Sequence, residues 1–197
     1  CSALSSLSLM QDLASFSAAK LLGSACGQLT NIVIGASVAS VGEGAFAGCS
    51  ALKTVIIPAG VTRIGDQAFD DCESLTRILF LGDAPVLGGP YVFDKYPPTV
   101  YYLNGRSGWG TPFGECQKLC WNPAVQPEAE FGFASGLFGF TVGGTPGIPL
   151  KVEASANLVS GVWTSVTNAE LDAEGLLTVS DPDSVSAPAR FYRIAFP

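Results

Sequence analysis

The stretch CSALKTVIIPAGVTRIGDQAFDDC, Cys49–Cys72, carries a pattern that recurs along the first half of this 197-residue chain. A shift of 23 residues in either direction places apolar residue on apolar residue and cysteine on cysteine. The equivalent positions are Leu29, Leu52 and Leu75; Ile32, Val55 and Ile78; Ile34, Ile57 and Phe80; Cys26, Cys49 and Cys72; Phe46 and Phe69; and Gly42 and Gly65. A fixed period of this length is typical of a solenoid, in which repeats bury their apolar faces by stacking.

Each repeat is expected to hold a short strand, at Leu29–Ile34, Leu52–Ile57 or Leu75–Phe80, and a second short segment, at Val38–Val41 or Val61–Ile64. Consecutive strands should stack about 4.8 Å apart as a parallel sheet. Each repeat forms one coil, or rung, of the solenoid. The first rung, Cys1–Ala25, carries a two-residue insertion. Because Cys1–Leu9 copies the pattern of Cys49–Ile57, we expect residue 1 to lie within a repeat of a longer chain.

The fourth rung begins at Cys72 and drifts, since Phe93 falls one residue late and Tyr96 takes the cysteine position. The pattern stops after Leu103, and three aromatic residues that follow are suited to covering the last rung: Trp109, Phe113 and Trp121. We therefore predict a leucine-rich-repeat solenoid with its cap over residues 1–121.

The second half of the chain has a different composition. Residues 122–130 contain two prolines and no periodicity, which predicts a linker. Residues 131–197 alternate short apolar runs with turn residues, which predicts a small antiparallel β-sandwich. Its expected strands are Phe131–Ala134, Phe138–Gly143, Leu150–Ala154, Trp163–Thr167, Leu176–Ser180 and Phe191–Ala195. The predicted fold class is mainly β, a solenoid of parallel strands followed by a sandwich.

The amino-acid composition argues against several classes of function. The chain has no histidine, so neither a Ser-His-Asp or Cys-His catalytic system nor a His-containing zinc site can be built from it. Its formal net charge of −7 argues against nucleic acid as a partner. Two uncharged stretches, 21–42 and 131–150, are unconvincing as membrane spans, because one fits the repeat and the other is rich in glycine. We predict no catalytic residue, no cofactor and no metal.

The cysteines fall into two groups. Cys1, Cys26, Cys49 and Cys72 share the repeated position, and their spacing is unlike that of zinc sites, so we expect a ladder of small buried apolar side chains. Cys116 and Cys120 lie outside the repeat, four residues apart, and either form a disulfide in a turn or remain free thiols.

The outward face of the predicted sheet holds the candidate ligand-binding residues. In Leu-x-x-Val-x-Ile the named residues point inward, so Val33, Ile56 and Leu79 lie side by side on the open face. Exposed apolar rows of this kind often mark interaction surfaces, although β-propensity alone also explains one. Their polar neighbours are Asn31, Lys53 and Arg77. Whether Tyr101 extends the row stays open, because the fourth rung fits two registers.

Acidic residues gather at expected turns: Asp70, Asp71, Glu73, Asp172, Glu174, Asp181 and Asp183. They lack the spacing of an EF-hand, so we expect solvated turn residues, with Asp181 before Pro182 starting a turn.

The template Cys-x-x-Leu-x-x-Ile-x-Ile-Pro-x-x-Val-x-x-Ile-Gly-x-x-Ala-Phe-x-x-Cys resembles the bacterial surface-antigen (BspA-like) class of leucine-rich repeats over residues 1–103. Residues 152–155, 163–164, 181–183 and 190–193 look like a C-terminal β-sandwich module of secreted bacterial repeat proteins. The resemblance implies a secreted or surface-displayed protein that binds other macromolecules or host components. Together with the composition, this predicts a non-enzymatic extracellular adhesion protein with a protein or glycan as its partner. Two alternatives are a structural spacer or anchor of a larger surface protein, and the accessory glycan-binding end of a secreted enzyme.

Overall fold

The computed structural model describes residues 6–8, 23–93, 95–127, 129, 131–134, 136–159, 161–185 and 189–197. Most of the predicted first rung, including Cys1, lies outside these ranges. The chain divides into two compact units, Cys1–Leu119 and Cys120–Pro197. Over the described parts of the chain, no helix has the length and apolarity needed to cross a membrane.

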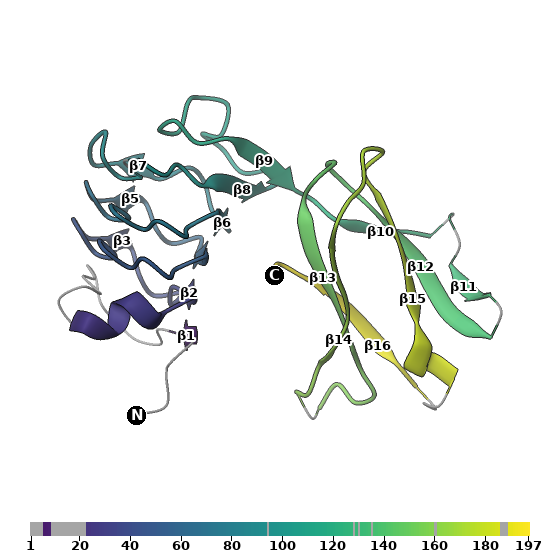
Figure 1. The fold of residues 1–197 in the computed structure, drawn as a ribbon. Coiled ribbons are helices and arrows are strands. Elements are labelled where there is room, and N and C mark those ends of the chain that lie inside the picture. The colour runs from purple at the N-terminus through teal and green to yellow at the C-terminus, as the bar shows by residue number, and fades with distance from the viewer. Residues whose placement is uncertain are drawn as a thin grey trace. The chain divides into compact units, whose positions relative to one another are not determined.

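The first unit is a solenoid whose coils carry two parallel sheets (Figure 1). The larger sheet has six strands in the order β1 (Ser6–Ser8), β2 (Asn31–Val33), β4 (Thr54–Ile57), β6 (Arg77–Phe80), β8 (Thr99–Leu103) and β9 (Lys118–Trp121). The smaller sheet has three, in the order β3 (Ser40–Val41), β5 (Arg63–Ile64) and β7 (Val86–Leu87). A 3-10 helix, η1 (Gly23–Gln28), precedes β2. These strands confirm the predicted solenoid.

The Cys-x-x-Leu part of the repeat forms a turn that leads into each strand. The backbone N–H groups of Leu29, Leu52 and Leu75 donate to the carbonyls of Cys26, Cys49 and Cys72 at 3.2, 3.0 and 2.9 Å. Because these leucines close turns, the strands begin two residues later than the pattern predicted, at Asn31, Thr54 and Arg77. The leucine side chains still point into the core.

The interior repeats the same side chains at each level. Leu29, Leu52 and Leu75 are all buried in one apolar cluster. The rings of Phe46 and Phe69 stack with centroids 5.3 Å apart. Phe93 continues the column at 5.8 Å from Phe69, so its ring joins the stack although the residue falls one position late in sequence.

The repeated glycine is required by the close approach of neighbouring rungs. A Cβ placed on Gly65 would lie 2.4 Å from the backbone nitrogen of Glu43, and one on Gly88 would lie 2.7 Å from that of Asp66. Any side chain at this position would force adjacent coils apart, which accounts for glycine at positions 65 and 88.

Aromatic side chains close the end of the solenoid. Trp109 and Phe113 pack on Phe80, with ring centroids 5.0 and 5.4 Å away, and Tyr102 stacks on Trp109 at 5.2 Å. The Trp109 indole N–H donates to the Gly82 carbonyl at 3.2 Å, so its polar group is satisfied although the residue is buried. The expectation that these two residues cover the last rung is therefore confirmed.

Trp121 does not share that role. It belongs to the second unit, where its indole N–H donates to the Pro149 carbonyl at 2.8 Å and its ring meets Phe196 edge-on. Trp121 is not among the described side chains that pack against the solenoid core, so the expectation that it covers the last rung is wrong.

The second unit contains two antiparallel sheets. In the first, β12 (Leu137–Gly143) pairs with β10 (Ala124–Gln126), β11 (Gly132–Ala134) and β15 (Leu176–Asp181). The second has the order β14 (Thr164–Glu170), β13 (Pro149–Ser155) and β16 (Phe191–Ala195). A short 3-10 helix, η2 (Pro182–Val185), follows β15. All six expected strands are present within a few residues, whereas β10 lies inside the stretch 122–130 that was expected to be a linker.

Aromatic contacts hold the two sheets of this unit together. Tyr192 on β16 contacts Phe138 and Phe140 on β12, with ring centroids 5.3 and 5.4 Å apart. Val152 and Val179 are buried on the two sheets. The mainly β fold class is confirmed in both halves of the chain.

Candidate functional site

The register of the larger solenoid sheet brings the candidate apolar residues together. Val33 pairs with Ile56, and Ile56 pairs with Leu79, so the three occupy neighbouring positions on β2, β4 and β6. The next position is Tyr101, which pairs with Leu79 and extends the row onto β8. The structure thus decides between the two registers that the sequence left open.

The exposed fraction of the side chain falls steeply along this row from Val33 to Tyr101. Val33 is 43% exposed and Ile56 is partly exposed, whereas Leu79 and Tyr101 are only 3% and 5% exposed. Leu79 and Tyr101 are buried outside the apolar cluster that fills the solenoid. The open apolar surface therefore lies over β2 and β4, and Leu79 contributes little to it. The repeat pattern predicts which way a side chain points, but not how much of it is covered.

The polar candidates border the same surface. Asn31 and Lys53 are exposed, and Arg77 is half-buried. The Lys53 backbone is fixed between rungs, because its N–H donates to the Thr30 carbonyl at 2.7 Å and its own carbonyl accepts from Thr76 N–H at 3.1 Å. A rigid backbone thus presents the cationic side chain. Arg77 adds a positive charge to this face, and the exposed Lys53 directly before β4 is also cationic, in a chain whose net charge is −7.

The cysteine ladder differs from the expectation of unbonded apolar side chains. Cys26 and Cys49 form a disulfide, with Cα atoms 5.0 Å apart. Cys72, one rung further, is a buried thiol whose Sγ donates to the Phe46 carbonyl at 3.1 Å, and burial raises its pKa to about 12. The spacing of stacked strands, about 4.8 Å, falls within the Cα separation that disulfides need, so the repeat itself held the signal for such a bond.

Cys116 and Cys120 are both free thiols in the structure. Burial raises the pKa of Cys116 to about 12, with a further contribution from the charge of Glu115, and burial also raises the pKa of Cys120. The disulfide considered for this pair is not formed here. Within the described ranges, no three cysteine or carboxylate side chains come together as metal ligands.

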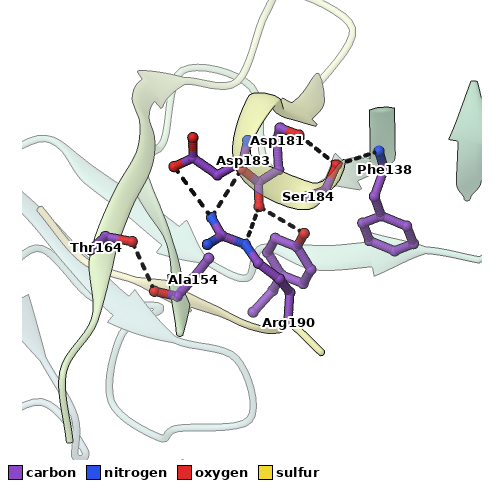
Figure 2. Close-up of polar contacts among 8 residues, drawn as sticks. Phe138, Ala154, Thr164, Asp181, Asp183, Ser184 and Arg190 are labelled. Atoms are coloured by element: carbon purple, nitrogen blue, oxygen red, sulfur yellow. Dashed lines mark hydrogen bonds and ion pairs between the residues drawn. The ribbon is translucent and has the colours of Figure 1, made fainter. Parts of the chain in front are cut away.

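A buried ion pair lies at the start of η2 in the second unit (Figure 2). Asp181 is 1% exposed and accepts from Arg190 Nε at 2.6 Å, from Arg190 Nη2 at 3.0 Å and from the Tyr192 hydroxyl at 2.8 Å. Burial alone would raise the pKa of Asp181, but the hydrogen bonds from Arg190 and Tyr192 outweigh it and lower that pKa. Both carboxylate oxygens are occupied by the protein, which indicates a structural role rather than an acid or base.

This finding corrects one prediction and supports another. Asp181 was expected to be solvated, and it is buried, because Arg190 and Tyr192, nine and eleven residues later, place their donors against its carboxylate. Its Oδ1 also accepts from the N–H of Asp183 at 3.0 Å, so the expected turn at Pro182 does form. Ser184 extends the cluster: its hydroxyl donates to the Asp181 carbonyl at 2.7 Å and accepts from Phe138 N–H at 2.9 Å.

A second buried carboxylate lies on β13. Glu153 is 6% exposed and forms ion pairs with Lys151 and Arg193. Burial would raise the pKa of Glu153, but the hydrogen bonds from the two cations lower it overall. Arg193 also lies over the Trp163 ring, 4.3 Å from its centroid, as a cation–π contact. Residues 153 and 193 lie in segments that carry the resemblance to a sandwich module, but their contact was not predicted from the sequence, because strand pairing alone brings them together.

The comparisons with known proteins bear on the first half of the chain. A family model described as a BspA type leucine rich repeat region matches residues 1–96 in six copies. No curated protein matches the chain, and no solved structure does. Such repeat regions are often part of bacterial surface proteins involved in binding or adhesion, and are typically scaffolds without enzymatic activity. The matched copies, the parallel strands and the stacked core agree with one another. Residues 1–96 therefore belong to the BspA-type leucine-rich repeat family.

Proposed function

We propose that this protein is a non-catalytic binding protein, displayed outside the cell, that holds a macromolecular partner on the exposed end of its larger solenoid sheet. The observation that supports this most directly is the position of Val33. It is 43% exposed and in register with the partly exposed Ile56, and the exposed Asn31 lies two residues before it on the same face of β2. A fixed apolar surface with polar groups at its rim has the composition of a protein-binding patch.

The charge of this face indicates what kind of partner fits. Arg77 lies on the same face of the sheet as Val33, and Lys53 is exposed directly before β4, while the chain as a whole is acidic. A partner protein or glycan that presents an apolar group beside negative charge would complement them. Because the strands are already hydrogen-bonded across four rungs, binding would need little rearrangement of the sheet.

Single charge insertions test this proposal. The labelled full chain would first be applied to an array of purified extracellular proteins and glycans, and binding to any positive spot would then be measured in solution. Ile56→Asp and Val33→Asp should each weaken binding by at least about tenfold, since a carboxylate in an apolar contact loses its hydration without a partner. Lys53→Glu should weaken it in a salt-dependent manner.

The matched control is Val86→Asp. Val86 is 63% exposed and lies on β7, in the smaller sheet of the same unit. This variant should bind as the wild type does. If Val86→Asp abolishes binding and Val33→Asp does not, the binding face is on the other sheet and the proposal fails.

A further inference from the structure

The loop that joins β13 to β14 in the second unit exposes three large apolar side chains. Leu158, Val159 and Val162 are 57%, 94% and 64% exposed. A single exposed apolar residue is ordinary on a protein surface, but three so close in sequence form a patch. The sequence between Glu153 and Glu170 contains no charged residue. The loop therefore carries no charge that would lose its hydration in an apolar medium.

The backbone of this loop is held by nearby polar side chains. Asn157 Oδ1 accepts from the Val159 N–H at 2.8 Å, and Ser155 Oγ accepts from the Asn157 N–H at 3.2 Å. At the base of the loop, the Thr164 hydroxyl donates to the Ala154 carbonyl at 3.1 Å (Figure 2). These local hydrogen bonds satisfy backbone groups without water, which lowers the cost of moving the loop into an apolar medium.

Two further exposed apolar residues lie at the same end of the unit. Phe191, the first residue of β16, pairs with Ser155 at the end of β13 and is 39% exposed. Val185 ends η2 and is 65% exposed. Figure 1 shows η2 and the β13–β14 loop at the same end of the second unit. The apolar surface of the loop thus continues onto its neighbours.

The loops 144–148 and 171–175, at the opposite end, are different. Their large apolar residues, Ile148 and Leu171, are 0% and 3% exposed, whereas Asp172 and Glu174 are exposed. One end of the unit therefore presents acidic loops to water, and the other presents apolar ones.

The charged side chains beside the apolar end neutralise one another. The ion pairs join Lys151 and Arg193 to Glu153, and Arg190 to Asp181 and Asp183. These three cations and three carboxylates sum to zero, whereas the whole chain has a net charge of −7. An anionic surface would repel the chain without being attracted to this end. A surface with no net charge is the better complement.

The base of the loop carries the two kinds of side chain that suit a membrane interface. Trp163 directly precedes β14, and the Arg193 guanidinium lies over its ring, 4.3 Å from the centroid. The Arg193 side chain is 49% exposed. Indole rings favour the headgroup region of a bilayer, and arginine keeps its charge in water while its stem covers apolar surface.

We propose that this end of the second unit inserts Leu158, Val159 and Val162 into the surface of a zwitterionic phospholipid bilayer. A bilayer accepts a protruding side chain without a preformed pocket, which suits the 94% exposed Val159. Trp163 and Arg193 then lie at the level of the headgroups. This surface is separate from the solenoid sheet that the proposed function uses, so each can be removed without the other.

The test is sedimentation of the full chain with phosphatidylcholine vesicles, and with vesicles of equal parts phosphatidylcholine and phosphatidylglycerol. The chain should sediment with the first kind and less with the second, because its net charge is −7. Brominated phosphatidylcholine should quench part of the tryptophan fluorescence, and Trp163→Phe should remove that quenching.

Substitutions at the tip of the loop separate apolar contact from charge. Val159→Asp should lower the partition coefficient at least about tenfold, because insertion would strip a carboxylate of its hydration. Val159→Ser should lower it by about 2- to 10-fold through the loss of apolar area alone. Ala173→Asp is the matched control, since it adds the same charge at an exposed position of the opposite end, and it should bind as the wild type does.

Three results would overturn the proposal. They are a chain that does not sediment with phosphatidylcholine vesicles, a chain that prefers the phosphatidylglycerol vesicles, and equal binding of Val159→Asp and Ala173→Asp. Sedimentation velocity without lipid tests the alternative that a second copy covers this end. A wild-type dimer that Val159→Asp dissociates, together with no vesicle binding, would assign the loop to self-association instead.

Discussion

At the scale of single residues, the buried carboxylate of Asp181 is the clearest determinant of stability in the second unit. Replacing it by asparagine removes the negative charge and one of the two acceptor oxygens, which leaves the Arg190 guanidinium without its buried counter-charge. We expect Asp181→Asn to lower the free energy of unfolding by about 3 kcal/mol, as is usual when one member of a buried ion pair is removed. Urea denaturation followed by near-UV circular dichroism would measure it.

Asp183 provides the matched control. Its carboxylate lies 3.8 Å from Arg190 but its side chain is 73% exposed. Asp183→Asn should change the free energy of unfolding by less than about 1 kcal/mol, because exposed ion pairs contribute little. Equal losses in both variants would contradict the role assigned to burial.

The cysteines make a second prediction at this scale. A pKa of about 12 leaves the Cys72 thiol on the order of one part in ten thousand ionised at pH 8, and burial excludes reagents as well. We expect iodoacetamide to modify Cys72 only after unfolding in guanidinium. Cys26 and Cys49 should resist modification even in guanidinium, until a reductant is added. Peptide mass spectrometry would measure the alkylation of each cysteine. Alkylation of Cys26 or Cys49 in the unfolded, unreduced chain would show that they are not bonded.

At the scale of elements, the spacing between rungs depends on glycine. Gly65→Ala places a methyl group 2.4 Å from the Glu43 nitrogen, a distance that only backbone movement can relieve. We expect a loss of about 1–3 kcal/mol in the free energy of unfolding, in the range of overpacked positions. Thermal unfolding of the full chain would detect it.

Gly60→Ala is the comparison for this substitution. Gly60 lies in the same rung, but a Cβ there meets its nearest atom, the Ala36 carbonyl oxygen, at 3.4 Å. This variant should be close to wild type in stability. A similar loss at both positions would mean that glycine is needed for some reason other than the approach of neighbouring coils.

Much of the architecture could be predicted at this scale, because it is local. The 23-residue period places Leu52 and Phe69 correctly, since each repeat folds by the same short turns and strands. Long-range pairing could not be predicted. The contact of Asp181 with Arg190 depends on how two antiparallel sheets meet. The pairing of Val125 on β10 with Val142 on β12 has no periodic signal in the sequence. For the candidate face the direction of Val33 and Ile56 was predictable, but the burial of Leu79 was not.

At the scale of the whole molecule, the two units should respond differently to acid. Asp181 and Glu153, both in the second unit, have lowered pKa values. Their stabilisation is complete above the unfolded pKa values, about 3.9 and 4.3, and is lost as pH falls toward the folded ones. In the first unit, the hydrogen bond from the Ser107 backbone also lowers the pKa of Asp83, but that carboxylate is exposed and contributes less. Calorimetry of the full chain should therefore show two transitions, of which one moves further to lower temperature between pH 5 and pH 3.

The variants assign these transitions. Asp181→Asn should lower the temperature of the more acid-sensitive transition, and Gly65→Ala should lower the temperature of the other transition. A single transition that both variants shift equally would show that residues 1–119 and 120–197 unfold together, and would argue against the proposed division of the chain.

The aromatic lid of Trp109 and Phe113 has a consequence for self-association. An open stack of parallel strands exposes unpaired backbone groups that invite another chain to dock and continue the array, which is a route to fibres. Here β9 occupies the hydrogen-bonding positions beside β8, and the two rings fill the space that an incoming coil would need. The two rings therefore stop a further coil from stacking on the solenoid core at this end, so a high concentration of the chain does not extend the stack through it.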